Sequence, residues 1–272
     1  MSKPRIALIG GGYVLSYLAQ KLDPCSFVIT SRSDSTVEQF KQNGFTAYKL
    51  DITQKDEVEN FMKTFRTIST LIDSVPPQHT LPDPLIGTKN ICSSLKESNC
   101  SRAFYLGTTG VFGVADGSWV DERTPCTPQA EKSLRRVQSE QLYKDLEISF
   151  TSFRLSGIYG PGRGMEERIK KDTYTKSLTP NRWSNRVHLE DIVQTLLNAL
   201  DSEELLPEAF CVSDDKPLQV EQIEAYFSKK LNLELKEDKN KKPSYRAALN
   251  QRVSNALLKE KLLPSLKHPF LF

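Results

Sequence analysis

Three consecutive glycines near the N-terminus constrain the fold of this chain more than any other feature. They follow the apolar segment Ile6–Ile9 and precede a helical pattern of apolar residues at 14–22. A strand that ends in a glycine turn at a helix N-terminus brings backbone N–H groups and the positive end of the helix dipole to one point, which suits a phosphate group. The alternative is a plain strand–helix turn, because a glycine triplet also occurs in such turns.

The spacing of the glycines is typical of dinucleotide binding, with one departure. The motif has glycine at its first, third and sixth positions, and here those positions hold Gly10, Gly12 and Leu15. The third glycine of the motif allows close packing of helix and strand, so a leucine there need not touch the phosphates. We expect a dinucleotide at this turn, contacted by Gly10, Gly12, Tyr13 and Val14, and an empty site blocked by Leu15 is the weaker alternative.

Composition and charge exclude several classes of protein. A net charge of +3 over 272 residues does not suggest nucleic acid, and no apolar stretch approaches the ~20 residues of a membrane span. Five scattered cysteines without metal-ligand spacing predict a reducing compartment, no disulfides and no metal site. We expect a cytoplasmic monomer or homodimer whose partner is a small-molecule substrate, with no nucleic acid and no membrane. The basic segment 229–267 is interpreted as a solvated surface, with attraction of an anionic ligand as the alternative.

Strand-like and helix-like segments alternate along the chain, which is typical of a parallel sheet covered by helices. After the first strand, apolar and β-branched runs predict strands at 27–30, 47–50, 70–75, 102–106, 149–155 and 209–212. Helices are expected at 14–22, 37–42, 57–65, 85–96, 131–146 and 191–200. The order predicts an α/β fold, a Rossmann-type doubly wound parallel sheet with a small C-terminal substrate lobe. The dinucleotide-binding core is expected at residues 1–160, with 187–215 returning to it, and the lobe at 161–186 and 216–272.

The end of the second strand indicates which nicotinamide cofactor the turn would take. An acidic residue there binds the ribose 2′-hydroxyl of NAD, whereas an arginine accommodates the 2′-phosphate of NADP. The strand ends in Ser31, Arg32 and Ser33, a cationic fork between two hydroxyls, and Asp34 comes too late to replace the ribose acid. NADP is therefore the predicted cofactor and NAD the second choice, unless Arg32 is only an exposed loop charge.

Several later segments carry a resemblance to a known family. They are Leu50–Thr53, Gly107–Gly113, Arg154–Arg163, Arg186–Asp191 and Arg252–Asn255. With the glycine turn, in this order and spacing, they resemble the extended and atypical short-chain dehydrogenase/reductases, which include nucleotide-sugar epimerases and dehydratases. The similarity runs almost from end to end.

The resemblance implies roles for particular residues. Asp51 would contact the adenine, and further cofactor contacts would come from Ile52, Ser74, Val75, Thr108 and Ser156. Tyr159 and Arg186 would bind the substrate, with Arg186 gripping its phosphates, although a surface salt bridge would explain that arginine equally well.

The catalytic pair of the family is absent at the matching positions. Family enzymes use a Tyr-x-x-x-Lys pair, in which the lysine and the cationic nicotinamide favour the ionised phenol. The corresponding helix has Lys132 in place of the tyrosine and Arg136 in place of the lysine. Arginine can hold ribose hydroxyls but stays protonated, and Lys132 could act as a base only with a pKa lowered by burial. Thr108 remains as the Ser/Thr equivalent, so the candidate catalytic residues are Thr108, Lys132 and Arg136.

Two of the histidines have ordinary explanations. His79 follows two prolines in a loop and is expected at the surface. His188 is expected to form a local hydrogen bond at the start of a helix, where Asp191 serves as a cap or first-turn acid.

Two hypotheses for function follow. The first is an NADP-dependent reductase or epimerase/dehydratase-like enzyme acting on a small substrate, with phosphorylated and nucleotide-linked compounds included. The second is an inactive NADP(H)-binding sensor or regulatory protein that has lost the Tyr-Lys pair.

Overall fold

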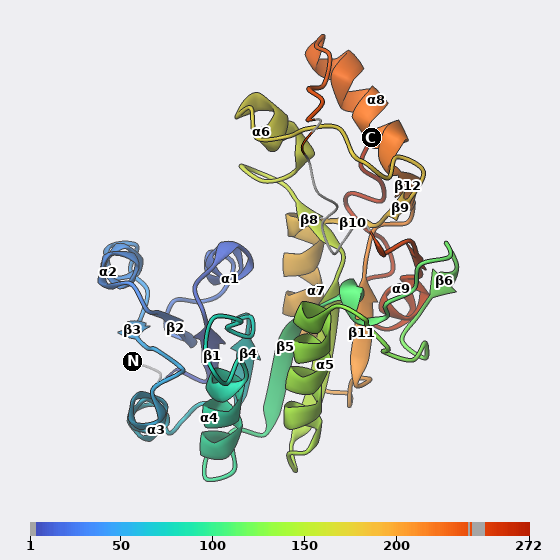
Figure 1. The fold of residues 1–272 in the computed structure, drawn as a ribbon. Coiled ribbons are helices and arrows are strands. Elements are labelled where there is room, and N and C mark those ends of the chain that lie inside the picture. Colours follow the sequence, from blue (N-terminus) through green and yellow to red (C-terminus); the bar gives the residue numbers. More distant parts are fainter. Residues whose placement is uncertain (1–3, 239, 241–247) are drawn as a thin grey trace. The chain divides into compact units, whose positions relative to one another are not determined.

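The computed structural model describes residues 4–238, 240 and 248–272, and a seven-stranded sheet runs through it (Figure 1). The strand order is β11-β7-β5-β4-β1-β2-β3. Its strands are β1 (Ile6–Ile9), β2 (Phe27–Ser31), β3 (Ala47–Lys49), β4 (Thr70–Asp73), β5 (Arg102–Thr108), β7 (Ser149–Leu155) and β11 (Ala209–Val212). All neighbouring pairs from β3 to β5 are parallel. The predicted Rossmann-type parallel sheet is confirmed.

The chain divides into two compact units. The first comprises 1–107, 131–153 and 199–209, and the second 108–130, 154–198 and 210–272. Strands β7 and β11 contribute residues to both units, so the sheet belongs to both.

Helices cover both faces of the sheet in the first unit. They are α1 (Tyr13–Ala19), α2 (Asp34–Gln42), α3 (Lys55–Thr64), α4 (Ile86–Leu95) and α5 (Glu131–Lys144). Helices α3, α4 and α5 lie side by side on one face, and α1 and α2 lie on the other (Figure 1). Successive residues of the central strands point to opposite faces, and Ala7 and Leu8 in β1, like Val28 and Ile29 in β2, are all fully buried, so these strands lose contact with water on both faces.

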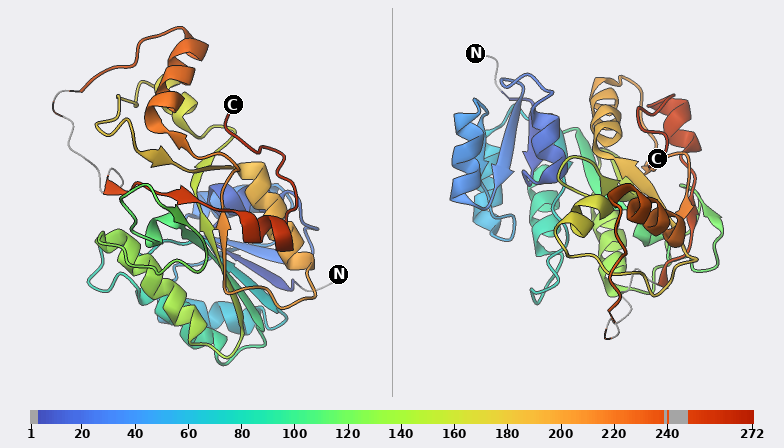
Figure 2. Two further views of the ribbon diagram at one scale, coloured as in Figure 1. Left: turned by 90° about the vertical axis from the view of Figure 1, so that its right-hand side faces the viewer. Right: turned by 90° about the horizontal axis from the view of Figure 1, so that it is seen from above.

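Among its described residues, the second unit contains short strand pairs, four α-helices and one 3-10 turn. Its strands outside the large sheet are β6 (Trp119–Val120), β8 (Gly157–Tyr159), β9 (Trp183–Ser184), β10 (Arg186–His188), β12 (Leu218–Gln219) and β13 (Arg252–Val253). They pair as β10–β8, β12–β9 and β13–β6. Its α-helices α6 (Met165–Lys170), α7 (Leu189–Asp201), α8 (Val220–Leu231) and α9 (Ala256–Lys261) follow a 3-10 turn at Thr109–Val111, and α7 ends in the first unit. Helices α6 and α8 share a small apolar core, and they lie near each other in both figures (Figures 1 and 2).

Element boundaries differ from the sequence expectation where polar residues set them. Helix α2 begins at Asp34 rather than residue 37, because the Ser33 hydroxyl accepts a hydrogen bond from the Thr36 N–H at 3.4 Å. The segment 160–186, expected as loop-rich, contains α6 and β9. Lys239, Lys241 and Lys242 of the basic segment lie outside the described residues. Within the described ranges, every helix is too short or too polar to cross a membrane.

Candidate functional site

The glycine turn is fixed by the ends of two neighbouring strands. Gly10 has φ +84°, and its N–H donates to the Thr30 hydroxyl at 3.1 Å. A Cβ atom at Gly10 would lie 2.6 Å from Cγ2 of Val75. The Ser74 hydroxyl donates to the carbonyl of Gly10 at 2.7 Å and closes the turn onto β4. The structure thus brings together three predicted cofactor residues, Gly10, Ser74 and Val75.

The other side of the turn is open. A Cβ atom at Gly12 would meet nothing within 4 Å among the described atoms, and no side chain caps α1 at this residue. Tyr13 and Val14 form the first turn of α1, where helical N–H groups lack partners within the helix. Leu15 is fully buried, so the departure from the glycine motif fills the core and leaves the turn unchanged.

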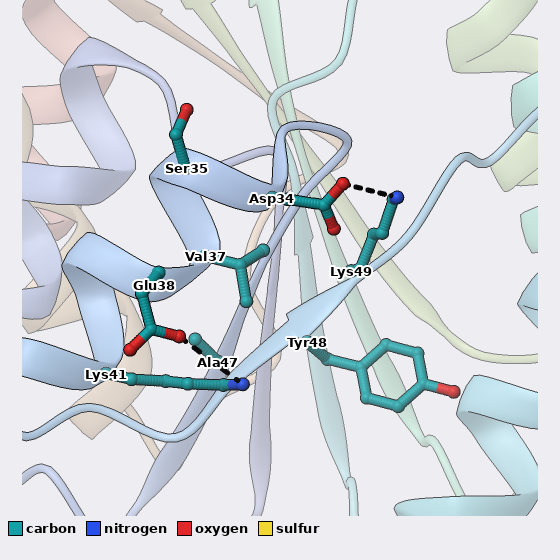
Figure 3. A pocket seen from close by; sticks show the side chains of 8 residues that line it. All are labelled: Asp34, Ser35, Val37, Glu38, Lys41, Ala47, Tyr48 and Lys49. Atoms are coloured by element: carbon teal, nitrogen blue, oxygen red, sulfur yellow. Dashed lines mark hydrogen bonds and ion pairs between the residues drawn. The ribbon is translucent and has the colours of Figure 1, made fainter.

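The three residues predicted for the ribose phosphate adjoin the N-terminus of α2. Arg32 is exposed, and its Nη1 lies 3.4 Å from Oε1 of Gln78. The Ser33 N–H donates to the Ser31 hydroxyl at 3.2 Å, and the Ser33 hydroxyl lies 2.7 Å from the hydroxyl of Ser35. The Asp34 carboxylate forms an ion pair with Lys49 at 2.7 Å on the rim of a surface groove (Figure 3). Asp34, which comes too late along the chain to bind an NAD ribose, is thus paired with Lys49.

The loop after β3 orients Asp51 through local hydrogen bonds. Asp51 Oδ1 accepts from the N–H and the hydroxyl of Thr53, at 3.0 and 2.8 Å. Ile52 is buried against Gly87 of α4, and its carbonyl accepts from Asn90 Nδ2 at 2.9 Å. Both predicted residues therefore have fixed positions at the carboxyl edge of the sheet.

Arg136 is held against the end of β5. Its Nη1 donates to the Tyr105 hydroxyl at 3.0 Å and to the Leu106 carbonyl at 3.3 Å. Lys132, one turn earlier in α5, is exposed. An arginine in this position offers fixed positive charge and hydrogen-bond donors, but it cannot relay a proton.

His79, which the sequence predicts at the surface, is a further candidate for proton transfer. It is exposed, as expected, but its pKa is lowered by partial desolvation and by the positive charges of Lys132 and Arg136. The imidazole is therefore able to accept a proton near neutral pH, and Lys132 and Arg136 are the cations that act on it. The sequence gives no sign of this, since 53 residues separate His79 from Lys132.

Beneath Arg136 lies a second group that the sequence did not indicate. Asp73, at the end of β4, is fully buried and accepts from the Tyr143 hydroxyl at 2.8 Å. Burial raises its pKa to about 6, against the opposing effects of the Val75 N–H, Tyr143 and Arg136.

In the second unit, Thr108 and Ser156 occupy different settings. The Thr108 hydroxyl accepts from the Gly110 N–H at 3.2 Å and caps the 3-10 turn. Ser156 is buried, and its hydroxyl has no hydrogen-bond partner among the described atoms. An unpaired buried hydroxyl is costly, and a bound ligand would satisfy it.

Tyr159 and Arg186, both predicted for substrate, line one pocket of about 250 Å³ within the second unit. Its other lining residues are Gly160, Arg163, Gly164, Met165, Glu166, Glu167, Tyr226, Phe227, Lys230 and Leu271. Burial lowers the pKa of Arg186 and raises the pKa of the nearby Asp214 to about 8. Arg186 is half-buried rather than exposed, which disfavours the surface salt-bridge explanation.

The fold and the glycine turn define an α/β protein of the Rossmann type. The model of the NAD-dependent epimerase/dehydratase family matches residues 6–208, and the chain belongs to this family. No match was found among curated proteins.

Solved structures share the fold over nearly the whole chain. A conserved protein of unknown function from Silicibacter pomeroyi is 28% identical with a TM-score of 0.79, over 97% of this chain and 94% of that one. UDP-glucose 4-epimerase from Thermus thermophilus, in complex with NAD, is 15% identical with a TM-score of 0.77, over 94% and 92%. L-threonine 3-dehydrogenase from Trypanosoma brucei is 15% identical with a TM-score of 0.78, over 97% and 92%.

Proposed function

We propose that this chain binds NADP(H) through its first unit. The observation that carries the proposal is the glycine turn, which is locked against β2 and β4 on one side and open over Gly12 on the other. Arg32, Ser31 and Ser33 would hold the 2′-phosphate, and Asp51 the adenine side. The bound nicotinamide would supply a hydride donor or acceptor. The family and the NAD-bound epimerase structure support a nicotinamide dinucleotide, and Arg32 favours NADP.

We propose that the chain is a reductase or an epimerase/dehydratase-like enzyme. Its small substrate would carry a phosphate or a nucleotide group, because Arg163 and Arg186 line one pocket and attract anions, whereas Lys230 of the same lining is ion-paired with Glu166. The core would span 1–160 and 187–215, and the substrate lobe 161–186 and 216–272. We propose a cytoplasmic monomer or homodimer.

The polar groups have separate roles in this proposal. Thr108 and Ser156 would donate hydrogen bonds to the substrate or cofactor. Arg136 would hold the ribose hydroxyls. Lys132 is exposed and so lacks the burial that would make it a base, and proton transfer would fall to His79, whose pKa is lowered.

The alternative is an inactive NADP(H)-binding sensor or regulatory protein. The exchange of the family tyrosine and lysine for Lys132 and Arg136 favours it, because neither replacement is a phenol whose ionised form a neighbouring lysine could stabilise. The enzyme and the sensor would bind the same cofactor, but only the enzyme would convert a substrate.

Fluorescence titration with NADPH and NADH tests the shared part. We expect NADPH to bind at least tenfold more tightly, since charge-assisted hydrogen bonds are worth about 1.5–3 kcal/mol each. The Arg32→Ala variant should lose this preference, whereas Arg66→Ala, which removes another exposed arginine of the first unit, should keep it. An unchanged ratio in Arg32→Ala would refute the phosphate assignment, and no binding of either cofactor would refute both functions.

Turnover separates the enzyme from the sensor. NADPH oxidation is followed with a panel of carbonyl compounds and nucleotide sugars. A reductase should oxidise NADPH with at least one of them. An epimerase or dehydratase should instead convert a nucleotide sugar in the presence of NADP⁺ with no net change in the cofactor. In either case His79→Ala should lower the rate at least tenfold without changing NADPH affinity. Tight NADPH binding without hydride exchange would favour the sensor.

A further inference from the structure

Two of the three histidines of the chain meet at one carboxylate in the second unit. His268 Nε2 lies 2.6 Å from Oε2 of Glu190, and His188 Nδ1 lies 3.8 Å from the same oxygen. The imidazole centroids are 3.6 Å apart. One ligand atom from each residue lies within 4.8 Å of the other two. Two imidazole nitrogens and a carboxylate oxygen form a donor set that zinc and other divalent transition metals bind.

The backbone around these side chains is already fixed. Asp191, which is buried, accepts from the N–H groups of Lys267 and His268 at 2.7 and 3.1 Å. His188 is held from the other side, because its Nδ1 accepts from the Glu190 N–H at 3.2 Å and its ring packs edge-on against Tyr159. A metal would therefore find His268 and His188 within a short movement of binding positions, which lowers the entropy cost of assembling the site.

A lysine competes with a metal for the carboxylate of Glu190. Lys267 Nζ lies 2.9 Å from Glu190, but its side chain is 68% exposed and can turn into water. An exposed ion pair of this kind contributes little to stability, much less than a set of metal–ligand bonds.

We propose that His188, Glu190 and His268 form a binding site for a divalent transition metal of the zinc type. Three protein ligands leave a fourth position open to water. Because His268 precedes the last four residues, the metal would clamp the C-terminal tail to the start of α7. That tail then passes Tyr159, whose hydroxyl lies 3.5 Å from the Phe270 carbonyl, and places Phe272 in a stack on Tyr226 at 3.9 Å. The metal site would thus fix the segment that borders the pocket lined by Tyr159 and Tyr226.

Titration of the untagged protein with Co²⁺ tests the proposal, because bound Co²⁺ absorbs visible light according to its ligands. We expect one saturable Co²⁺ site per chain, displaced by Zn²⁺. His268→Ala and Glu190→Gln should each weaken it at least tenfold. His79→Ala, which removes the third histidine, should bind as the parent does, and Lys267→Ala should bind at least as tightly.

Circular dichroism of each variant checks that the fold is retained, and Glu190→Gln keeps the size and hydrogen-bonding capacity of the side chain. Absence of saturable Co²⁺ binding would overturn the proposal. Equal binding by His268→Ala and the parent would also overturn it, and would leave the cluster as a set of hydrogen bonds and ion pairs.

Discussion

The Asp73 carboxyl is fully buried where β4 ends, and its ordinary tendency to ionise conflicts with that environment. It accepts from the Val75 N–H and the Tyr143 hydroxyl, both at 2.8 Å. These donors and the charge of Arg136 favour the ionised form, but burial outweighs them and raises the pKa to about 6. The free energy of unfolding therefore depends on whether this buried carboxyl carries a proton.

The sign of its pH effect follows from the raised pKa. Between about pH 4 and about pH 6 the folded protein keeps the Asp73 proton that the unfolded chain has lost, so stability falls as pH rises through this window. The shift corresponds to roughly 3 kcal/mol at about 1.4 kcal/mol per pKa unit. Asp73→Asn should remove this component from the free energy of unfolding, measured by urea denaturation from about pH 4 to about pH 7.

The exposed Glu97→Gln variant is the control, since it also removes one carboxylate from the first unit. It should follow the pH dependence of the parent. If Asp73→Asn also follows it, the buried carboxyl does not carry the effect.

At the scale of elements, the β1–α1 turn contains two adjacent glycines, Gly11 and Gly12, that have different roles. A Cβ atom at Gly11 would lie 2.4 Å from Cε2 of Phe40 in α2, whereas one at Gly12 would enter open space. Gly11 therefore serves packing between elements, and Gly12 keeps the surface over the helix N-terminus clear.

Two alanine variants distinguish the packing role of Gly11 from the binding role of Gly12. Gly11→Ala should lower the free energy of unfolding by about 1–3 kcal/mol, because the added methyl forces Phe40 to move within a packed core. Gly12→Ala should change stability by less than about 1 kcal/mol but weaken NADPH binding at least tenfold, since its Cβ would face the proposed pyrophosphate. Urea denaturation and NADPH titration are the measurements. Equal losses of stability in the two variants would contradict this division.

At the scale of the whole molecule, the two units share strands rather than a simple linker. The chain passes from the first unit to the second within β7, after Phe153. Unfolding of one unit therefore removes part of a strand that the other unit needs, and we expect the units to unfold together.

Cysteine labelling can report on both units at once. Cys92 and Cys100 are buried in the first unit and Cys211 in the second, and burial raises the thiol pKa to about 12 for Cys92 and to about 11 for Cys100. In the native protein iodoacetamide should modify the exposed Cys25 and spare these three thiols. With increasing urea, all three should become reactive over one concentration range, as read by mass spectrometry. Reactivity of Cys211 at clearly lower urea than Cys92 would show that the units unfold separately.

Local sequence patterns predicted much of the fold. Apolar runs placed β7 and β11 at their observed bounds, and the glycine turn at Gly10 and Gly12 stands between β1 and α1 as its spacing predicts. Such features depend on residues a few positions apart, so they can be predicted from the sequence. Helix boundaries were less accurate, because caps such as Ser33 move them by a turn.

The sequence by itself determined the class of this protein: a parallel α/β sheet, a glycine turn suited to a dinucleotide, and an α5 without the usual Tyr-Lys pair. Only the tertiary structure decided which distant groups act on one another. Asp73 meets Tyr143 across 70 positions, and Glu190 meets His268 across 78. No periodicity records such pairs, because they arise when separate elements pack, and burial and electrostatics then set their chemistry. The open space over Gly12 and the buried hydroxyl of Ser156 became visible for the same reason.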